Sequence, residues 1–490
     1  MRHLRCYNHC VATTIPQPAP AAAPPDPRRF LILAVCCMSL FIVGLDGTIV
    51  NVALPSIRAD LGASVSELQW TIDAYTLVLA SLLLLSGSMA DRFGRARVFK
   101  LGLLLFTAGS LLCSVAPDVR TLIVARMLQA VGGSMLNPVA MSIIRNTFTD
   151  PRERAQAIGI WGGVIGISLA LGPVLGGALS DGGSWRAIFW VNVPVGLAAI
   201  VLTSRLVPES RAPRPRRPDP VGQALIVVLL AATVFGIIEA PGQGWLSAQT
   251  LVLAAVSVAA LAGLIAYERR RPEPVIDLRF FRSAPFAGAT LMAIAAFVSL
   301  GGFLFLNTLY LQEARGLRPL HAGLLTLPMA AAAAILAPLT GRFVGRRGAR
   351  LPLIAAGLGM GASAVLLTRV TPDTSTAYLL LAYVLFGIGF GCVNAPITNA
   401  AVSGMPAAQA GVAAAVASTS RMVGQSLGVA VVGAVAVSAT GTPEQLAAAA
   451  GPGWWIIAGC GLFIVAAGVA TTGEWALRTA RATAREFGTT

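Results

Sequence analysis

The chain has 490 residues, of which 56% are apolar and 12% are charged, whereas a soluble globular protein has about 25% charged residues. This composition excludes a water-soluble protein, because too few polar residues exist to cover a surface in water. The net charge of +15 does not indicate a nucleic-acid-binding protein either, because the basic residues fall between apolar runs and no helix-turn-helix, zinc-finger or base-stacking module is present.

Residues 1–29 form a tail rich in proline and alanine. The tail lacks the apolar run of a cleavable signal peptide, so we expect it to be disordered and cytoplasmic. Cys6 and Cys10 lie near two histidines in this tail. Their spacing is not that of a zinc finger, and we predict no metal site in the chain.

Apolar runs close to the length that crosses a bilayer follow the tail as far as residue 472. Lipid cannot hydrogen-bond a peptide backbone, so such runs must form helices rather than open sheet. The predicted spans are 30–52, 68–90, 97–116, 120–142, 155–180, 186–207, 221–240, 249–267, 285–311, 322–343, 351–369, 376–400, 409–437 and 453–472. The sequence therefore predicts an all-α polytopic membrane protein with fourteen transmembrane helices.

Basic residues gather in the loops on one face of this arrangement: before the first span and after the second, fourth, sixth, eighth and tenth. Positive charge in short loops marks the cytoplasmic side. An even number of spans puts both termini on that side. We therefore expect a multi-pass protein of the inner (cytoplasmic) membrane with both termini in the cytoplasm.

An internal repeat relates the loop after the second span to the loop after the tenth. Residues 87–95 and 341–348 both place glycine, a basic cluster and a second glycine at the same offsets, although Gly345 replaces the acidic Asp91. Chance similarity is the alternative explanation. Taken as a repeat, the pattern predicts two parallel six-helix halves with two inserted helices. The predicted domains are a tail (1–29), a first bundle (30–207), a linker with two inserted helices (208–267), a second bundle (268–473) and a cytoplasmic tail (474–490).

Several motifs occur in order on successive spans. The loop after the second span reads Gly87-x-x-Ala90-Asp91-Arg92-x-Gly94-Arg95-x-Arg97, and the fourth span holds Arg126-x-x-Gln129. The fifth span reads Gly159-x8-Ser168-x3-Gly172-Pro173-x2-Gly176-Gly177. A motif that begins Leu45-Asp46-Gly47-Thr48 and runs to Pro55 lies at the end of the first span. The sixth span opens with Trp185-Arg186.

With these motifs the sequence resembles the major facilitator superfamily, and within it the 14-helix drug:proton antiporters. The resemblance covers nearly the whole chain after residue 30. It departs from the family pattern at Ser168 and at Ala130, where the family has glycine. Both residues are small, so close helix packing is retained.

The resemblance implies a gate and a seal. The gate would latch the cytoplasmic side shut and consists of Gly87, Asp91, Arg92, Gly94, Arg95 and Arg97. The seal is the antiporter motif of the fifth span, which accompanies export in the family and consists of Gly159, Ser168, Gly172, Pro173, Gly176 and Gly177. Membrane topology alone would explain the arginines of the gate, but it requires neither Asp91 nor the glycines.

Ionisable residues inside a bilayer are costly and are therefore functional candidates. Asp46, Asp73 and Arg126 lie at similar depth in the first half. One hypothesis is that Asp46 or Asp73 carries the coupling proton and that Arg126 tunes its affinity for the proton. The alternative is that Asp46 and Arg126 form a static ion pair, while Asp73 lies in water at a helix end.

Further polar residues within the spans could line a cavity or join helices by hydrogen bonds. These candidates are Gln129, Asn137, Asn307, Asn394, Arg421 and Gln425. Arg421 lies near the middle of its span, with no acid of the second half at comparable depth. It could attract an anionic group of a substrate or bind backbone carbonyls.

The favoured function is export of drugs, antibiotics or other amphipathic small molecules in exchange for protons by alternating access. A dedicated exporter of one metabolite, or less plausibly an importer, is the alternative. An enzyme is not expected, because only three histidines exist and none lies in a predicted span. No phosphate-binding loop is present, so we expect no cofactor and a proton gradient as the energy source. The expected partners are a small-molecule substrate, protons and lipid, and we expect a monomer.

Overall fold

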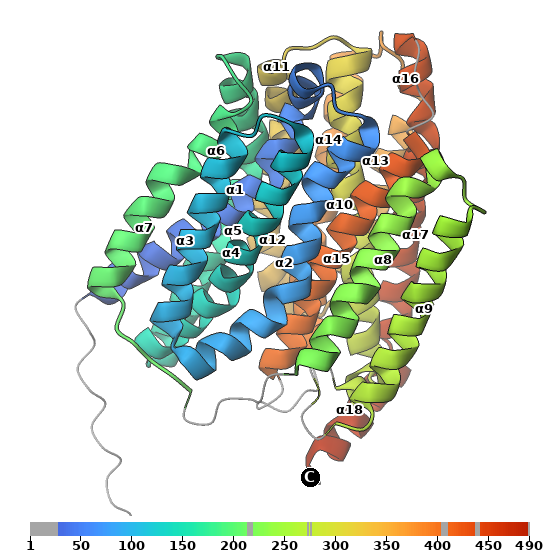
Figure 1. Ribbon diagram of the computed structural model, residues 1–490. Helices are drawn as coiled ribbons and strands as arrows, with labels where there is room; N and C mark the ends of the chain where they lie inside the picture. The colour runs from blue at the N-terminus through green and yellow to red at the C-terminus, as the bar shows by residue number, and fades with distance from the viewer. Residues whose placement is uncertain are drawn as a thin grey trace, which may run out of the picture.

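The computed structural model describes residues 28–212, 219–271, 274, 277–402, 410–436 and 442–488, and these residues contain helices and no β-strand (Figure 1). The predicted disordered tail lies outside the described residues up to position 27. The all-α prediction is confirmed for the part of the chain described.

Seven helices form what we call the first half: α1 (Arg29–Leu61), α2 (Val65–Phe93), α3 (Arg95–Ser114), α4 (Val119–Thr147), α5 (Pro151–Asp181), α6 (Ala187–Trp190) and α7 (Asn192–Leu206). Two helices follow, α8 (Pro220–Gln243) and α9 (Ala248–Glu268). The elements that we call the second half are η1 (Leu278–Arg282), α10 (Ala284–Leu309), a π-helical turn η2 (Tyr310–Ala314), α11 (Pro319–Leu325), α12 (Leu327–Arg347), α13 (Arg350–Leu367), α14 (Thr376–Val402), α15 (Ala410–Ala436), α16 (Pro443–Ala449) and α17 (Gly451–Thr471). A last helix, α18 (Glu474–Gly488), lies in the predicted C-terminal tail.

Thirteen helical segments in the described part of the chain are long and apolar enough to cross a membrane. α15 occupies the one remaining predicted span, 409–437. The fourteen-span fold is thus confirmed, although two spans are interrupted: α6 gives way to α7 at Val191, and α11 to α12 at Thr326. Hydropathy cannot detect such breaks, because the residues on both sides remain apolar.

α1 runs past its predicted end at residue 52 and stops at Leu61, where Gly62 adopts a left-handed conformation with φ of 64°. Its last turns carry Arg58 and Asp60, whose charges made this part of the helix invisible to hydropathy. Gly62 fits this turn because glycine has no Cβ to oppose a positive φ. α2 then starts at a capping box of Ser64 and Glu67.

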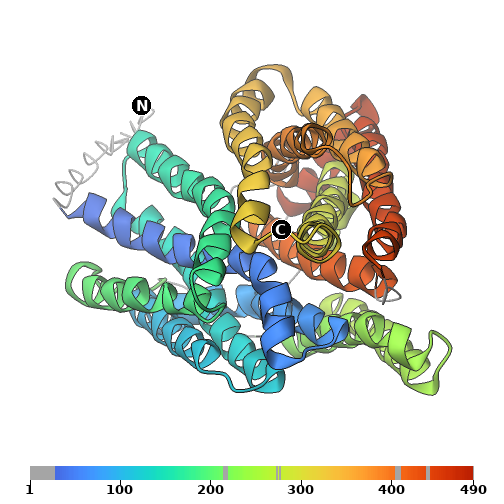
Figure 2. The same ribbon diagram turned by 90° about the horizontal axis from the view of Figure 1, so that it is seen from above.

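The two halves stand side by side as separate groups of helices in Figure 2. Within the first half α3 packs on α4, α4 on α2, and α1 on α5; within the second half α10 packs on α15, α13 on α14 and α17, and α12 on α14. The halves meet where α2 packs on α15 and where α5 packs on α11 and α12. α8 packs on both α2 and α15, and α9 packs on α8 at the outside of the bundle (Figure 1).

We call the end of the bundle at which α1 begins the terminal end, and the end at which α1 stops the distal end. α18 lies at the terminal end (Figure 1), where it packs on η1 and the start of α10. Ala476, Ala480 and Thr483 of α18 are buried. Glu486 pairs with Arg282 at 2.9 Å, so α18 is fixed to the second half by packing and by an ion pair.

Candidate functional site

A buried polar network lies inside the first half around Asp46 of α1. The Asp46 side chain is 0% exposed and pairs with Arg126 of α4, which is 1% exposed. Asp46 Oδ1 also accepts hydrogen bonds from Gln129 Nε2 at 2.8 Å and from Asn192 Nδ2 at 3.1 Å. An ionised Asp46 is therefore compensated by one cation and two amide donors.

Arg126 is held on every side. Its Nε donates to the Thr71 carbonyl of α2 at 3.1 Å, and its Nη1 donates to Gln129 Oε1 at 2.7 Å as well as to Asp46. Its guanidinium lies 4.1 Å from the centroid of the Tyr75 ring and 5.7 Å from that of Phe189. A cation between aromatic faces gains a favourable interaction with both rings. The network thus joins α1, α2, α4 and α7 around a single charge pair.

Asp73 lies on a different side of α2 from Thr71 and Tyr75, which contact Arg126. Its environment differs from that of Asp46, which is paired with a cation. Asp73 is 0% exposed, so it does not lie in water as one prediction had it. Its Oδ1 accepts a hydrogen bond from Thr76 at 3.3 Å, and its Oδ2 has no partner among the described residues. Ser426 of α15 lies beside it. No ion pair to Asp73 occurs in the part of the chain described, so its charge would be uncompensated between the two halves.

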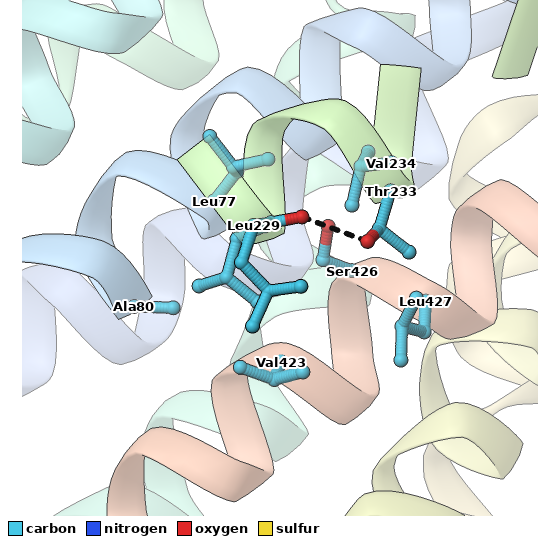
Figure 3. A pocket seen from close by; sticks show the side chains of 9 residues that line it. Leu77, Ala80, Leu229, Thr233, Val234, Val423, Ser426 and Leu427 are labelled. Atoms are coloured by element: carbon cyan, nitrogen blue, oxygen red, sulfur yellow. Dashed lines mark hydrogen bonds between the residues drawn. The ribbon is translucent and has the colours of Figure 1, made fainter. Parts of the chain in front are cut away.

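A cavity of about 190 Å³ lies beside this point, where α8 covers the line along which α2 meets α15 (Figure 3). Its wall is apolar apart from Thr233 of α8 and Ser426 of α15. Thr233 Oγ1 donates to the Leu229 carbonyl of its own helix at 2.7 Å. The wall therefore offers no charged group to a ligand.

Hydrogen bonds attach α8 to α2 at both ends. Trp70 Nε1 and Ser66 Oγ of α2 each donate to Glu239 Oε1 of α8 at 2.9 Å. Gln223 Nε2 of α8 donates to the Ser81 carbonyl of α2. The contacts of α8 with α15 are apolar, through residues such as Val234 and Leu427. α8 is thus bonded to the first half and only packed on the second.

The distal end of the bundle is closed by bonds between the halves. Arg58 of α1 pairs with Glu313 at 2.9 Å, and Arg318 pairs with Asp181 of α5 at 3.0 Å. Gln312 Nε2 donates to the Val52 carbonyl of α1 at 2.7 Å. Gln312 and Glu313 both belong to the π-helical turn η2, a rare conformation that is frequent at functional sites.

Gln69 makes a similar bond from the first half to the second. Its Nε2 donates to the Val429 and Ala430 carbonyls of α15 at 3.0 and 3.1 Å. A Cβ at Gly433 would come within 2.3 Å of this nitrogen, so glycine there leaves the room that Gln69 needs. The α2–α15 contact is therefore polar at Gln69 and holds the buried Asp73 one turn further along.

The predicted seal on α5 differs along its length. Gly172 and Gly176 lie against Thr48 and Ile49 of α1, since a Cβ there would meet their atoms at 1.9 and 2.7 Å. Gly177 lies against Pro319 of the second half, where a Cβ would meet the carbonyl oxygen at 2.5 Å. Ser168 lies against Gly44 of α1 in the same way.

Pro173 contacts the second half as well, because its carbonyl oxygen lies 2.2 Å from where a Cβ of Gly323 would be. In contrast, Gly159 has no atom within 4 Å of its Cβ position. α5 therefore touches the second half near the distal end, and its part toward the terminal end is not covered by a neighbour.

The residues of the predicted gate form a cluster within the first half. Asp91 Oδ1 accepts from Arg95 Nε at 3.1 Å and Nη2 at 2.8 Å. Gly94, with φ of 115°, caps the start of α3 from the position before Arg95, and Arg97 lies 3.6 Å from Glu209. Arg92 is exposed. A Cβ placed on Gly87 would lie 3.8 Å from the Pro138 side chain. Among the described residues, these bonds join the first half to itself and to the segment that follows α7 at Glu209, and none reaches the second half.

Glu209, which sequence reasoning missed, is the anchor of this cluster. Its carboxylate accepts hydrogen bonds from the Ala96 and Arg97 backbone N–H groups at 3.1 and 3.2 Å, so it caps the first turn of α3 from a distant segment. An anion at a helix N-terminus is stabilising. The available signal was that Glu209 is the one acid between the end of the sixth predicted span and a run of arginines.

The predicted cavity residues fall into two groups. Gln129 belongs to the Asp46 network, and Asn307 accepts from the Tyr383 hydroxyl at 2.5 Å inside the second half, so both join helices. Gln425 is also buried. Asn137, Asn394 and Arg421 are partly exposed. Gln69, Gln312 and the distal ion pairs were missed, because a polar residue near a helix end resembles an ordinary interfacial residue.

Comparison with known proteins places this geometry in a family. The family model described as "Major Facilitator Superfamily" matches residues 36–429. The chain belongs to the major facilitator superfamily. Its fold and relatives make it a membrane transporter and not an enzyme, as predicted, and a multi-pass protein of the cell membrane that acts on small molecules.

Several relatives match most of this superfamily chain. It is 38% identical to the multidrug resistance protein Stp of Mycobacterium tuberculosis (strain CDC 1551 / Oshkosh), over 83% of this chain and 76% of the relative. It is 37% identical to the tetracenomycin C resistance and export protein of Streptomyces glaucescens, over 84% and 77%. A crystal structure of the peptide transporter POT in complex with sulfate shares the fold, with a TM-score of 0.65, 19% identity, and coverage of 90% of this chain and 96% of that one.

Proposed function

We propose that this chain exports antibiotic-like small molecules in exchange for protons by alternating access. The drug-resistance relatives support export of foreign or self-made antibiotics. The tetracenomycin C relative, which is named for export of one compound, favours a dedicated exporter of a single secondary product as the second candidate. The proton gradient would supply the energy, with no cofactor.

We infer that the terminal end faces the cytoplasm. The exposed arginines at or just after the helix ends here, such as Arg92, Arg269 and Arg346, support this orientation through the positive-inside rule. Both chain termini would then be cytoplasmic. With the distal end closed, the described conformation corresponds to the inward-facing state of a monomeric transporter.

The moving bodies are the bundle at 30–207 and the bundle at 268–473. The linker and inserted helices at 208–267 would travel with the first bundle, because α8 is hydrogen-bonded to α2 and only packed on α15. The Asp91 cluster at the terminal end would act as the cytoplasmic gate. Its bonds inside the first half suit the released state of a latch, which would contact the second half when the cytoplasmic side closes.

Asp46 and Asp73 would have different parts in proton coupling. Arg126 and two amides already compensate Asp46 in this state. Asp73 has no cation, and an uncompensated carboxylate inside a membrane is costly. A proton on Asp73 would remove that cost, so we assign the coupling proton of the inward-facing state to Asp73. Loss of this proton would weaken the α2–α15 contact and favour opening at the distal end.

The single observation that carries this proposal is the pair of fully buried carboxylates, one with a cation and one without. The test uses inside-out membrane vesicles acidified by respiration, to which puromycin or ethidium is added. We expect the added compound to collapse part of the pH gradient with the wild-type chain. Asp73→Asn and Asp46→Asn should give no collapse, whereas the exposed control Asp60→Asn should behave as the wild type.

Failure of every compound, in vesicles that contain the folded chain, would contradict broad drug export and leave the single-product exporter. A wild-type collapse that persists with Asp73→Asn would show that Asp73 does not carry the proton.

A further inference from the structure

Arg421 is a second membrane-embedded arginine, and its environment differs from that of Arg126. It lies eleven residues into α15, about 16 Å along the helix from Ala410. No carboxylate of the described residues forms an ion pair with it, whereas Arg126 has Asp46. Arg421 is therefore a cation within the membrane whose charge has no counterpart in the described structure.

The hydrogen bonds of Arg421 leave part of its guanidinium unused. Nη2 donates to Thr398 Oγ1 of α14 at 2.5 Å, and the buried Nε has no partner. Thr398 Oγ1 in turn donates to the Asn394 carbonyl at 2.9 Å. Thr398 therefore uses its proton within α14 and its lone pair on Arg421. It orients the guanidinium but cannot itself donate to a ligand.

The position of this pair indicates that it faces space between the halves. Thr398 and Asn399 are exposed, and Arg421 is partly exposed. An arginine directed at lipid would be costly. The halves are bonded at the distal end, and Gly159 shows uncovered space toward the terminal end. Met422, the next residue on α15, packs on the first half, so Arg421 lies beside the boundary between the halves.

We propose that Arg421 binds an anionic oxygen group of the exported molecule, such as a carboxylate, and that Thr398 is its positioning residue. A guanidinium presents two parallel N–H groups to a carboxylate, and here Nη1 makes no hydrogen bond among the described residues. A backbone carbonyl, the other partner that the sequence left open, accepts no bond from Arg421 among the described residues. This inference rests on the proposed function, since it names the substrate class of the same transporter.

The experiment compares two probes that share one apolar body, 1-pyrenebutyrate and its neutral amide 1-pyrenebutanamide. Their binding to the purified full-length chain is measured by fluorescence titration. We expect the wild type to bind the carboxylate about tenfold more tightly than the amide, the size of a charge-assisted hydrogen bond. Arg421→Gln should remove this preference by weakening carboxylate binding alone, and Arg421→Lys should restore part of it.

Two further variants sharpen the test. Thr398→Val should reduce the preference only in part, because it frees the guanidinium without removing its charge. Arg342→Gln, at an exposed arginine of α12, is the matched control and should keep the full preference. Ethidium-driven collapse of the pH gradient in vesicles should likewise be unchanged in this control.

Equal binding of the two probes by the wild type, or an unchanged preference in Arg421→Gln, would overturn the proposal. Equal loss of both probes in Arg421→Gln, together with a lowered melting temperature, would assign Arg421 to structure and also overturn it. Failure of the proposed function is separate, because it appears as absence of any compound-driven proton movement in wild-type vesicles.

Discussion

The two ends of α5 differ although both are built from glycine. Near the distal end Gly172 and Gly176 pack on α1, and Gly177 packs on α11 of the second half. Toward the terminal end Gly159, Gly162 and Gly163 have no atom within 4 Å of their Cβ positions. The same residue type thus serves a closed contact at one end and an uncovered surface at the other, as expected of a helix whose two ends close in turn.

The bonds between the halves show the same difference. The ion pairs of Arg58 with Glu313 and of Arg318 with Asp181, and the bond from Gln312 to Val52, all lie at the distal end. Among the described residues, the Asp91 cluster at the terminal end bonds within the first half and to Glu209 just after α7, and not to the second half. The described bonds between the halves are thus found at the distal end and not at the Asp91 cluster.

The largest expected effect comes from the buried Asp46–Arg126 pair inside the first half. Arg126→Gln leaves Asp46 buried without a cation, and breaking such a pair costs about 3–5 kcal/mol. We expect antiport in vesicles to fall to background and the melting temperature of the purified chain to drop. The double variant Asp46→Asn/Arg126→Gln should recover the melting temperature but not antiport. Recovery of antiport would make the pair purely structural.

A larger residue on α5 should lower the stability of the chain more near the distal end than toward the terminal end. Gly177→Val would press on the Pro319 backbone, and such overpacking costs about 1–3 kcal/mol. The comparison variant Gly163→Val meets open space and should change the stability by less than about 0.5 kcal/mol. Melting temperatures in detergent measure both. Similar losses at the two positions would mean that the ends are equally packed.

The distal ion pairs should have a smaller effect, because the side chains of Arg58 and Glu313 are themselves partly exposed, at 34% and 19%. Exposed pairs contribute about 0–1 kcal/mol. We expect Glu313→Gln to change the transport rate by no more than about fivefold, which corresponds to this energy. The exchanged pair Arg58→Glu/Glu313→Arg should restore the rate. If Glu313→Gln had no effect and the exchanged pair abolished transport, these charges would have a role other than closure.

The smallest effect is expected at Asp118, at the start of α4. This helix start takes no part in the contacts between the halves described above. The Thr121 backbone N–H and hydroxyl donate to Asp118 and hold the pKa of this carboxyl below its usual value. Because the pKa is lower in the folded chain, the stabilisation is present above the ordinary value and is lost as pH falls through the folded value. The melting temperature should therefore fall slightly more steeply with acidification in the wild type than in Asp118→Asn. Identical pH profiles would contradict this capping role.

The sequence predicted the fold well, because hydropathy and membrane physics leave helices as the one choice for long apolar runs. It also indicated that Asp46 and Arg126 could pair, since both are charges at equal depth. The sequence could not show that Asp73 faces Ser426 of α15 instead of the Asp46 network. The direction in which a side chain of α2 points depends on how α2 packs on α15. Glu209 and Gln312 were missed for a related reason: their partners lie more than a hundred residues away.

The account depends most on the claim that a proton on Asp73 favours closure at the distal end. The direct measurement is the distance between spin labels at Ser184→Cys and His321→Cys, two exposed positions at the distal end, in a background without native cysteines, as pH is raised from 5 to 8. We expect a short distance at pH 5 that lengthens toward pH 8, and a distance that stays short at every pH when Asp73→Asn is added. A distance that does not respond to pH, or one that still lengthens in the Asp73→Asn chain, would contradict the account.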